Sequence, residues 1–320
     1  MMQRIESFDI LKGIGIILMI VAHTYGPNSP IWNFIYAFHM PLFFIVTGYF
    51  YKKIAISDLF IKNCNQLLIQ YIALCFIINV LVQIRQPHNI QKDIINVFTG
   101  IGPSWFLLAM FLSRIEFHFI LTFFPNHYYR TSFIISICVC FTTYFIELSS
   151  FLSFFPSLAS LFFLSTGYYI NHHNYLDHIK KHTITASFIG FVLWLITSLY
   201  GKVELSQCIF KLSIIDFAGS LGGTILCFIS SQLIYKYCSY LKTILSYAGK
   251  YSLVILFFHS IDYCFPIWHI LTPYFSQTIL LPSILVIRLL FVTVCVYISL
   301  HSRWLRYFFK IQYYYDNHNK

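Results

Sequence analysis

Lys12 and His23 are the residues whose types and spacing most directly suggest chemistry in this chain. They lie eleven positions apart in the first apolar stretch. At about 100° per residue, eleven helical steps end roughly 20° from where they began, so both side chains share one helix face, about 16 Å apart along the axis. The pair combines a cation for an anionic ligand with an imidazole for proton transfer or nucleophilic attack. The alternative is a lysine that snorkels to the membrane surface and a hydrogen-bonded core histidine.

The composition places this helix in a membrane. Hydrophobic residues make up 58% of the 320 residues and charged residues 10%, whereas soluble domains carry about 25% charged residues. The sequence therefore predicts an all-α polytopic membrane protein in which residues 1–320 form a single integral-membrane domain. We expect no removable signal peptide, because the first apolar stretch already contains Asp9 and Lys12.

Ten apolar segments predict membrane-spanning helices, and the charges between them predict their orientation. With a cytoplasmic N-terminus, fifteen of the 21 Lys and Arg residues fall on the inner side, and Arg114 and Arg288 fall within spans. This bias follows the positive-inside rule and places both termini in the cytoplasm, in an inner or plasma membrane. The four outer residues are Arg85, Lys92, Lys202 and Lys211. The ten expected spans are residues 8–25, 31–51, 67–84, 104–124, 131–148, 154–171, 183–200, 212–235, 251–269 and 279–301.

This asymmetry also explains the net charge of +10. We expect the excess positive charge to meet anionic membrane lipid at the inner leaflet, and we expect no nucleic-acid partner. The nine cysteines show no CxxC or zinc-type spacing, so we interpret them as packing residues and expect no metal.

The spans contain more ionisable residues than packing alone requires, which indicates a polar interior. His39 comes two residues before Pro41, and a proline inside a helix frees a backbone carbonyl that His39 could help to satisfy. His259 and Asp262 are three residues apart on one face, so that Asp262 can orient the imidazole or raise its basicity. The full set is Lys12, His23, His39, Arg114, Glu116, His118, Glu147, Asp216, His259, Asp262, His269 and Arg288.

Two segments repeat a pattern of small residues: FFIVTGYF at 43–50 and FFLSTGYY at 162–169. In membrane helices, glycine beside threonine or serine is typical of close helix packing. We therefore expect Gly48 and Gly167 to lie at helix contacts.

Several of these segments resemble the acyltransferase-3 family of membrane O-acyltransferases. The resemblance is carried by DILKGI at 9–14, VAH at 21–23 and FHMPLFFIVTGYF at 38–50, with weaker similarity in GPSWFL at 102–107, GYY at 167–169 and GKYSLVILFFH at 249–259. The branch it resembles most is that of fucose and enterobacterial-common-antigen acetyltransferases.

The resemblance implies roles for particular residues. It makes Lys12 the cation and His23 the essential histidine of an Arg/Lys-x10-His motif, and it implies ten spans, cytoplasmic ends and acyl-CoA as donor. Many members carry an Arg-x-x-Arg motif before the third span, where this chain reads Lys62-Asn63-Cys64-Asn65. That departure leaves Lys52, Lys53 and Lys62 to meet the CoA phosphates.

The expected function is transfer of an acetyl group from acetyl-CoA to a sugar hydroxyl of a cell-envelope polysaccharide or its lipid-linked precursor. His23 would remove the hydroxyl proton or carry the acetyl group itself, and Lys12 would hold CoA or pair with Asp9. His39, His259 and Asp262 are expected to support the site. The alternatives are a secondary transporter or flippase for an anionic or sugar-linked solute, and a haem- or quinone-binding redox protein.

Overall fold

The computed structural model is an assembly of helices around one central helix, α1 (Glu6–Tyr25). It describes residues 6–27, 29–85, 102–144, 154–266, 268, 274 and 276–311, and the structural statements below refer to these residues. The first half of the chain forms α2 (Pro30–Tyr36), α3 (His39–Tyr49), α4 (Ile56–Asn63), the π-helical turn η1 (Cys64–Leu68), α5 (Ile69–Arg85), the short turn η2 (Gly102–Ser104), α7 (Trp105–Phe123) and α8 (His127–Tyr144). The second half forms α9 (Phe154–His172), α10 (Tyr175–Lys181), α11 (Thr183–Tyr200), β1 (Val203–Glu204), η3 (Leu205–Gln207), β2 (Ile209–Phe210), α12 (Ile214–Tyr237), α13 (Ser239–Lys250), α14 (Ser252–Cys264), α15 (Gln277–His301) and α16 (Arg303–Phe308).

Seven described segments are long and apolar enough to cross a membrane, which confirms an all-α polytopic membrane protein. An eighth is counted if α13 and α14, which meet at 73°, form one broken span. The seven are α1, Pro30–Tyr49 across α2 and α3, Ile56–Ile84 across α4 and α5, Gly102–Phe123 across η2 and α7, α11, α12 and Ile279–His301 in α15.

The other three expected spans look different. The expected spans 131–148 and 154–171 overlap α8 (His127–Tyr144) and α9, which are helical but are not among the seven. The expected span 251–269 overlaps α14 (Ser252–Cys264), which follows the bend. The third span begins at Ile56 rather than near residue 67, so the stretch that carries Lys62 is helical. Lys92, Glu147 and His269 lie outside the described residues. The count of ten spans stays a prediction.

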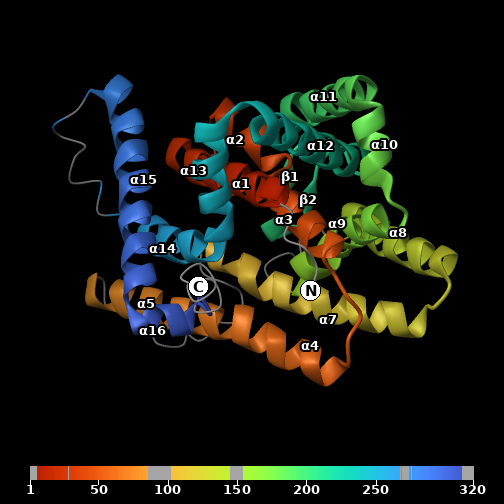
Figure 1. Ribbon diagram of the computed structural model, residues 1–320, viewed down its shortest axis with the longest axis horizontal. Coiled ribbons are helices and arrows are strands. Elements are labelled where there is room, and N and C mark those ends of the chain that lie inside the picture. The colour runs from red at the N-terminus through yellow and green to blue at the C-terminus, as the bar shows by residue number, and fades with distance from the viewer. Residues whose placement is uncertain are drawn as a thin grey trace.

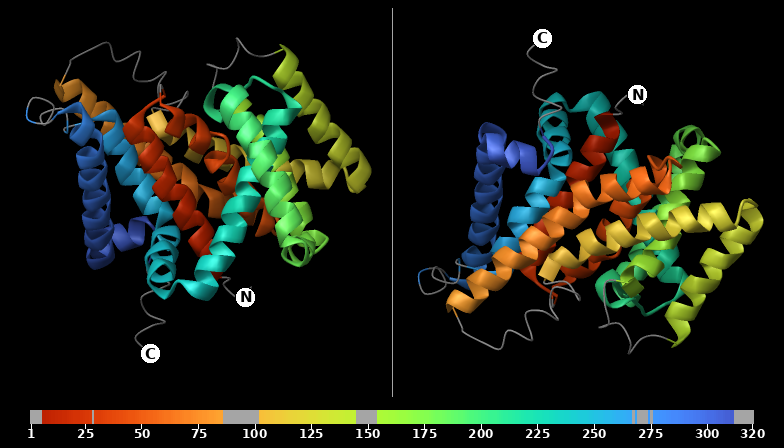
Figure 2. Two further views of the ribbon diagram at one scale, coloured as in Figure 1. Left: turned by 90° about the horizontal axis from the view of Figure 1, so that it is seen from above. Right: turned by 90° about the horizontal axis from the view of Figure 1, so that it is seen from below.

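Helix α1 runs through the middle of the bundle, as Figures 1 and 2 show. It packs against α2, α3, α12, α13, α14 and α15. Its apolar side chains, such as Ile10, Ile16 and Met19, are buried together with Asp9 and His23. Protein neighbours on several sides of α1 therefore keep these two polar groups away from lipid.

The second span is broken between α2 and α3, and the break has a local cause. Pro41 cannot donate a hydrogen bond to the carbonyl of Ala37. The Ser220 hydroxyl of α12 donates to that carbonyl oxygen instead, at 2.6 Å. The His39 Nδ1 donates to the Ile35 carbonyl oxygen at 3.1 Å. The expectation that His39 helps to satisfy the freed carbonyl is therefore wrong, because Ser220 occupies that position.

Gly48 and Gly167 let α3 and α9 touch along their backbones. A β-carbon at Gly48 would overlap the carbonyl oxygen of Leu164, and a β-carbon at Gly167 would overlap that of Ile45. Only glycine permits so close an approach, so the prediction of a packing role for both residues is confirmed.

Gly48→Ala and Gly167→Ala should each lower the free energy of unfolding by about 1–3 kcal/mol, because the added methyl group meets backbone that cannot rotate away. Thermal unfolding of the purified protein in detergent measures the change. Gly15→Ala is the control, since its methyl group would meet side-chain atoms of Phe43 and Leu42, which can rotate. A Gly48→Ala protein as stable as the Gly15→Ala protein would contradict this packing.

Candidate functional site

His23 lies near the C-terminal end of α1, and both of its ring nitrogens have partners. The Nδ1 atom lies 2.9 Å from Nε2 of His259 on α14, and the Nε2 atom lies 2.7 Å from the Tyr36 hydroxyl at the end of α2. The two imidazoles stack with their centroids 5.1 Å apart. Three elements therefore meet at His23, two of them next to the breaks in their spans.

Behind His259 lies an ion pair between Asp262 and Arg288. The Arg288 Nε atom of α15 lies 2.9 Å from Asp262 Oδ2, and this carboxylate oxygen lies 3.8 Å from His259 Nδ1. The Trp268 indole donates to the other carboxylate oxygen of Asp262. The expected face shared by His259 and Asp262 is present and is directed towards His23.

Arg288 also holds α1 itself. Its Nη1 donates to the His23 carbonyl oxygen and to the Thr24 hydroxyl, both at 3.1 Å. Arg288, Tyr36 and Thr24 were not predicted as site residues. An arginine inside an apolar span is the one signal that could have found Arg288, because such a residue needs an internal partner. We refer to His23, Tyr36, His259, Asp262 and Arg288 as the His23 cluster.

The geometry of the His23 cluster favours one placement of the hydrogen atoms on its two imidazole rings and on the Tyr36 hydroxyl. The Asp262 carboxylate beside His259 Nδ1 favours a hydrogen on that nitrogen, which leaves His259 Nε2 as an acceptor. His23 Nδ1 then donates to His259, and His23 Nε2 accepts a hydrogen bond from the Tyr36 hydroxyl. The arrangement therefore aims the lone pair of His23 Nε2 at a hydroxyl group.

Aromatic rings from α2 and α14 lie against His23. Trp32 stacks on Tyr36 with a centroid separation of 3.5 Å, and the Tyr263 ring lies 4.7 Å from the His23 ring. The His39 ring lies 4.5 Å from that of Tyr36, and its buried Nε2 has no hydrogen-bond partner among the described residues. His39 therefore borders the cluster through Tyr36.

A short hairpin, which was not predicted, packs against the same side. Strands β1 and β2 pair antiparallel with Val203 opposite Phe210, and β1 contacts α2. The Glu204 carboxylate interacts electrostatically with the hydroxyl groups of Tyr36 and Tyr263. A hydroxyl-bearing ligand that approaches His23 from this side would meet polar groups as well as rings.

Lys12 occupies the other half of α1. Its ammonium group forms an ion pair with Asp9 at 2.9 Å, which is one of the two roles the sequence left open for it. Lys52, Lys53 and Lys62 are exposed and lie on α4 and the segment before it. None of these lysines contacts the His23 cluster in the part of the chain that the structure describes, so the expected site residues fall into separate groups.

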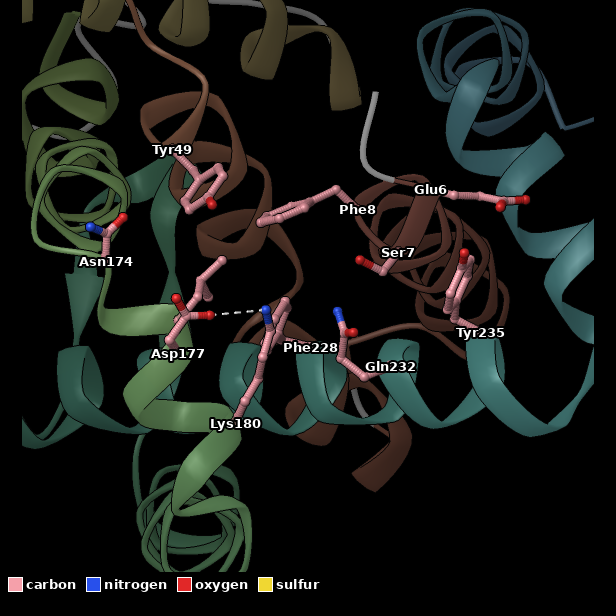
Figure 3. Close-up of a pocket in the computed structure, with 11 residues that line it drawn as sticks. Glu6, Ser7, Phe8, Tyr49, Asn174, Asp177, Lys180, Phe228, Gln232 and Tyr235 are labelled. Carbon is pink, nitrogen blue, oxygen red and sulfur yellow. Dashed lines mark hydrogen bonds and ion pairs between the residues drawn. The ribbon is translucent and has the colours of Figure 1, made fainter. Parts of the chain in front are cut away.

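A pocket of about 420 Å³ lies at the first turn of α1 (Figure 3). Aromatic residues, including Phe8 and Tyr49, form part of its wall, and Asp177 and Lys180 form an ion pair of 3.2 Å across one side. It contains none of the residues predicted to carry chemistry.

Comparison with known proteins identifies the family. A family model described as an acyltransferase domain, Acyl_transf_3, matches residues 5–301. The nodulation protein NolL of Mesorhizobium japonicum is 31% identical over 138 residues, which cover 38% of this chain and 37% of that relative. The matched segment thus spans little more than a third of NolL. No solved structure matches this chain.

The family model spans most of the chain, so the chain belongs to the acyltransferase-3 family. The family prediction made from the motifs around Lys12 and His23 is confirmed, and with it the prediction of an O-acyltransferase. The narrower resemblance to fucose and enterobacterial-common-antigen acetyltransferases stays a prediction.

Arg288→Met should lower the free energy of unfolding by about 3–5 kcal/mol, because it leaves the buried Asp262 carboxylate without its cation. Thermal unfolding in detergent measures this loss. The double variant Arg288→Met/Asp262→Leu should recover much of it, since both buried charges are then gone. Lys236→Met, which removes an exposed cation from α12, is the control and should leave stability unchanged. Unaltered stability of Arg288→Met would contradict the ion pair.

Proposed function

We propose that this chain transfers an acetyl group from acetyl-CoA, supplied from the cytoplasmic side, to a sugar hydroxyl of a cell-envelope polysaccharide or its lipid-linked precursor. The main support for this proposal is the hydrogen bond between His23 Nε2 and the Tyr36 hydroxyl. On the other side of the His23 ring, His259 Nε2 lies 2.9 Å from His23 Nδ1, and Asp262 lies beside His259. A sugar hydroxyl in the position of this phenol would meet a nitrogen that is ready to accept its proton. Membership of the family supports acyl transfer. The acetyl group, the acetyl-CoA donor and the sugar acceptor are our proposal.

The reaction needs a base because a sugar hydroxyl is a poor nucleophile at neutral pH. His23 Nε2 takes the hydroxyl proton as the oxygen attacks the thioester carbonyl. The carbon–sulfur bond then breaks, and the CoA thiolate leaves with the proton that His23 held. His259 Nε2, which accepts a hydrogen bond from His23 Nδ1, supports the imidazolium formed in between, and the Asp262 carboxylate beside His259 Nδ1 keeps His259 in that orientation.

A second route would place the acetyl group on His23 before the sugar receives it. We favour the base, because His259 and Asp262 are arranged to stabilise a proton on His23. Lys12, paired with Asp9 on the same helix, would stabilise the donor on its way from the cytoplasm. Lys52, Lys53 and Lys62 would attract the CoA phosphates.

The membrane arrangement is part of the same proposal. Ten spans with both termini in the cytoplasm would form one domain in the inner or plasma membrane, with Lys12 on the donor side of α1 and His23 deeper in the bilayer. The strong excess of Lys and Arg on one side of the expected spans supports this orientation. Membrane lipid, acyl-CoA and the glycan acceptor are the partners we propose.

A transporter or flippase is the second candidate function. The breaks between α2 and α3 and between α13 and α14 favour it, because interrupted helices often line transport paths. The two candidates differ in whether a covalent bond changes. Family membership and the His23 cluster favour acyl transfer.

His23→Ala should lower the rate of acetyl transfer by roughly 10²–10⁴, because it removes the base. The measurement is acceptor-dependent consumption of acetyl-CoA by the full-length protein in liposomes. His301→Ala, which alters an exposed histidine at the end of α15, is the matched control and should keep the wild-type rate.

Wild-type transfer by a folded His23→Ala protein would refute the mechanism. Movement of the glycan across the membrane without consumption of acetyl-CoA would refute the proposed function in favour of the transporter.

A further inference from the structure

Basic side chains gather where α4 and the preceding segment lie beside α7. The two elements pack against each other and run side by side in Figure 1. The Lys53 ammonium group donates to the Leu121 carbonyl oxygen at 3.3 Å, and Lys62 interacts electrostatically with both Lys52 and Arg114. We refer to Lys52, Lys53, Lys62 and Arg114 as the basic cluster. It combines residues that lie about fifty to sixty positions apart in the sequence.

Two polar groups accompany the cluster. The Tyr51 hydroxyl lies 3.3 Å from His118 Nδ1 and interacts electrostatically with Arg114. His118 in turn interacts with Lys53. A hydroxyl and an imidazole next to four cations are additional hydrogen-bonding groups for a bound anion.

No ion pair neutralises these cations in the part of the chain that the structure describes. None of the ion pairs between described residues involves Lys52, Lys53, Lys62 or Arg114. The Nε atom of Arg114 is buried and has no hydrogen-bond partner among the described residues. Like charges brought together without a counter-charge raise the free energy of the protein, so the cluster favours an anionic ligand.

In the pocket of Figure 3, by contrast, the charges are already paired. It contains two carboxylates, and each already has a cation: Asp177 pairs with Lys180, and Glu6 pairs with Lys242 at 3.1 Å. A phosphate placed there would have to displace a carboxylate from its partner. Of these two places, the basic cluster is the better site for a phosphate.

We propose that Arg114, together with the three lysines, binds a phosphate group of CoA and supplies the guanidinium that the Lys62-Asn63-Cys64-Asn65 stretch lacks. This inference rests on the proposed function, because that function supplies CoA as donor. Arg114 comes from α7 rather than from the Lys62-Asn63-Cys64-Asn65 stretch of α4 and η1, so a different helix provides the fork-shaped donor that phosphates prefer. A phosphate in a lipid headgroup has the same chemistry and is the other source that a test must separate.

The test is the affinity of the full-length protein for CoA and for dephospho-CoA, measured by calorimetry in nanodiscs of neutral lipid. Arg114→Gln should weaken CoA binding about tenfold, since one charge-assisted contact is lost. It should also reduce the preference for CoA over dephospho-CoA if the contact is to the 3′-phosphate. Arg114→Lys should bind CoA better than Arg114→Gln. Lys236→Gln, which removes an exposed cation elsewhere, is the matched control and should bind as wild type does.

The lipid source is tested by native mass spectrometry of the same variants with added phosphatidylglycerol. If Arg114→Gln loses bound phosphatidylglycerol but keeps wild-type affinity for CoA, the assignment to CoA is overturned. Unchanged binding of both ligands would overturn the phosphate site altogether. If Arg114→Gln does not fold, Lys62→Gln at an exposed position should weaken CoA binding, and wild-type affinity there would count against the site.

The proposed function fails in a different way. It fails if the wild-type protein binds no CoA and transfers no acetyl group. Only the phosphate site at Arg114 is refuted if transfer is intact and Arg114→Gln binds CoA as tightly as wild type.

Discussion

The ion pair between Arg288 and Asp262 is the constraint that fixes the centre of this molecule. Two charges buried among apolar helices are tolerated only when each satisfies the other, so α14 and α15 must keep the register that joins them. The same guanidinium holds the backbone of α1 at His23, and the same carboxylate lies beside His259. One interaction therefore sets both the packing of three helices and the orientation of the candidate catalytic imidazole.

Features that depend on local residue spacing or on residue size could be predicted from the sequence. The shared helix of Lys12 and His23, the common face of His259 and Asp262, and the packing role of Gly48 follow from helical periodicity or residue size, and the structure has all three. The family also followed from short motifs.

Tertiary partners could not be predicted in this way. Arg288 lies 265 positions from His23, and no periodicity connects them. The partner of the Ala37 carbonyl, Ser220, comes from another span, so the repair assigned to His39 was wrong. The bend between α13 and α14 and the hairpin at Val203–Phe210 were likewise not predicted. Together these contacts place the hairpin beside the His23 cluster.

His23 is proposed to catalyse acetylation of an envelope glycan. Mass spectrometry of that glycan, from cells with the gene, without it, and with the His23→Gln form in its place, tests it most directly. We expect glycan units heavier by one acetyl group in the first cells only. Acetylated glycan that persists without the gene, or at full level with His23→Gln, would contradict it.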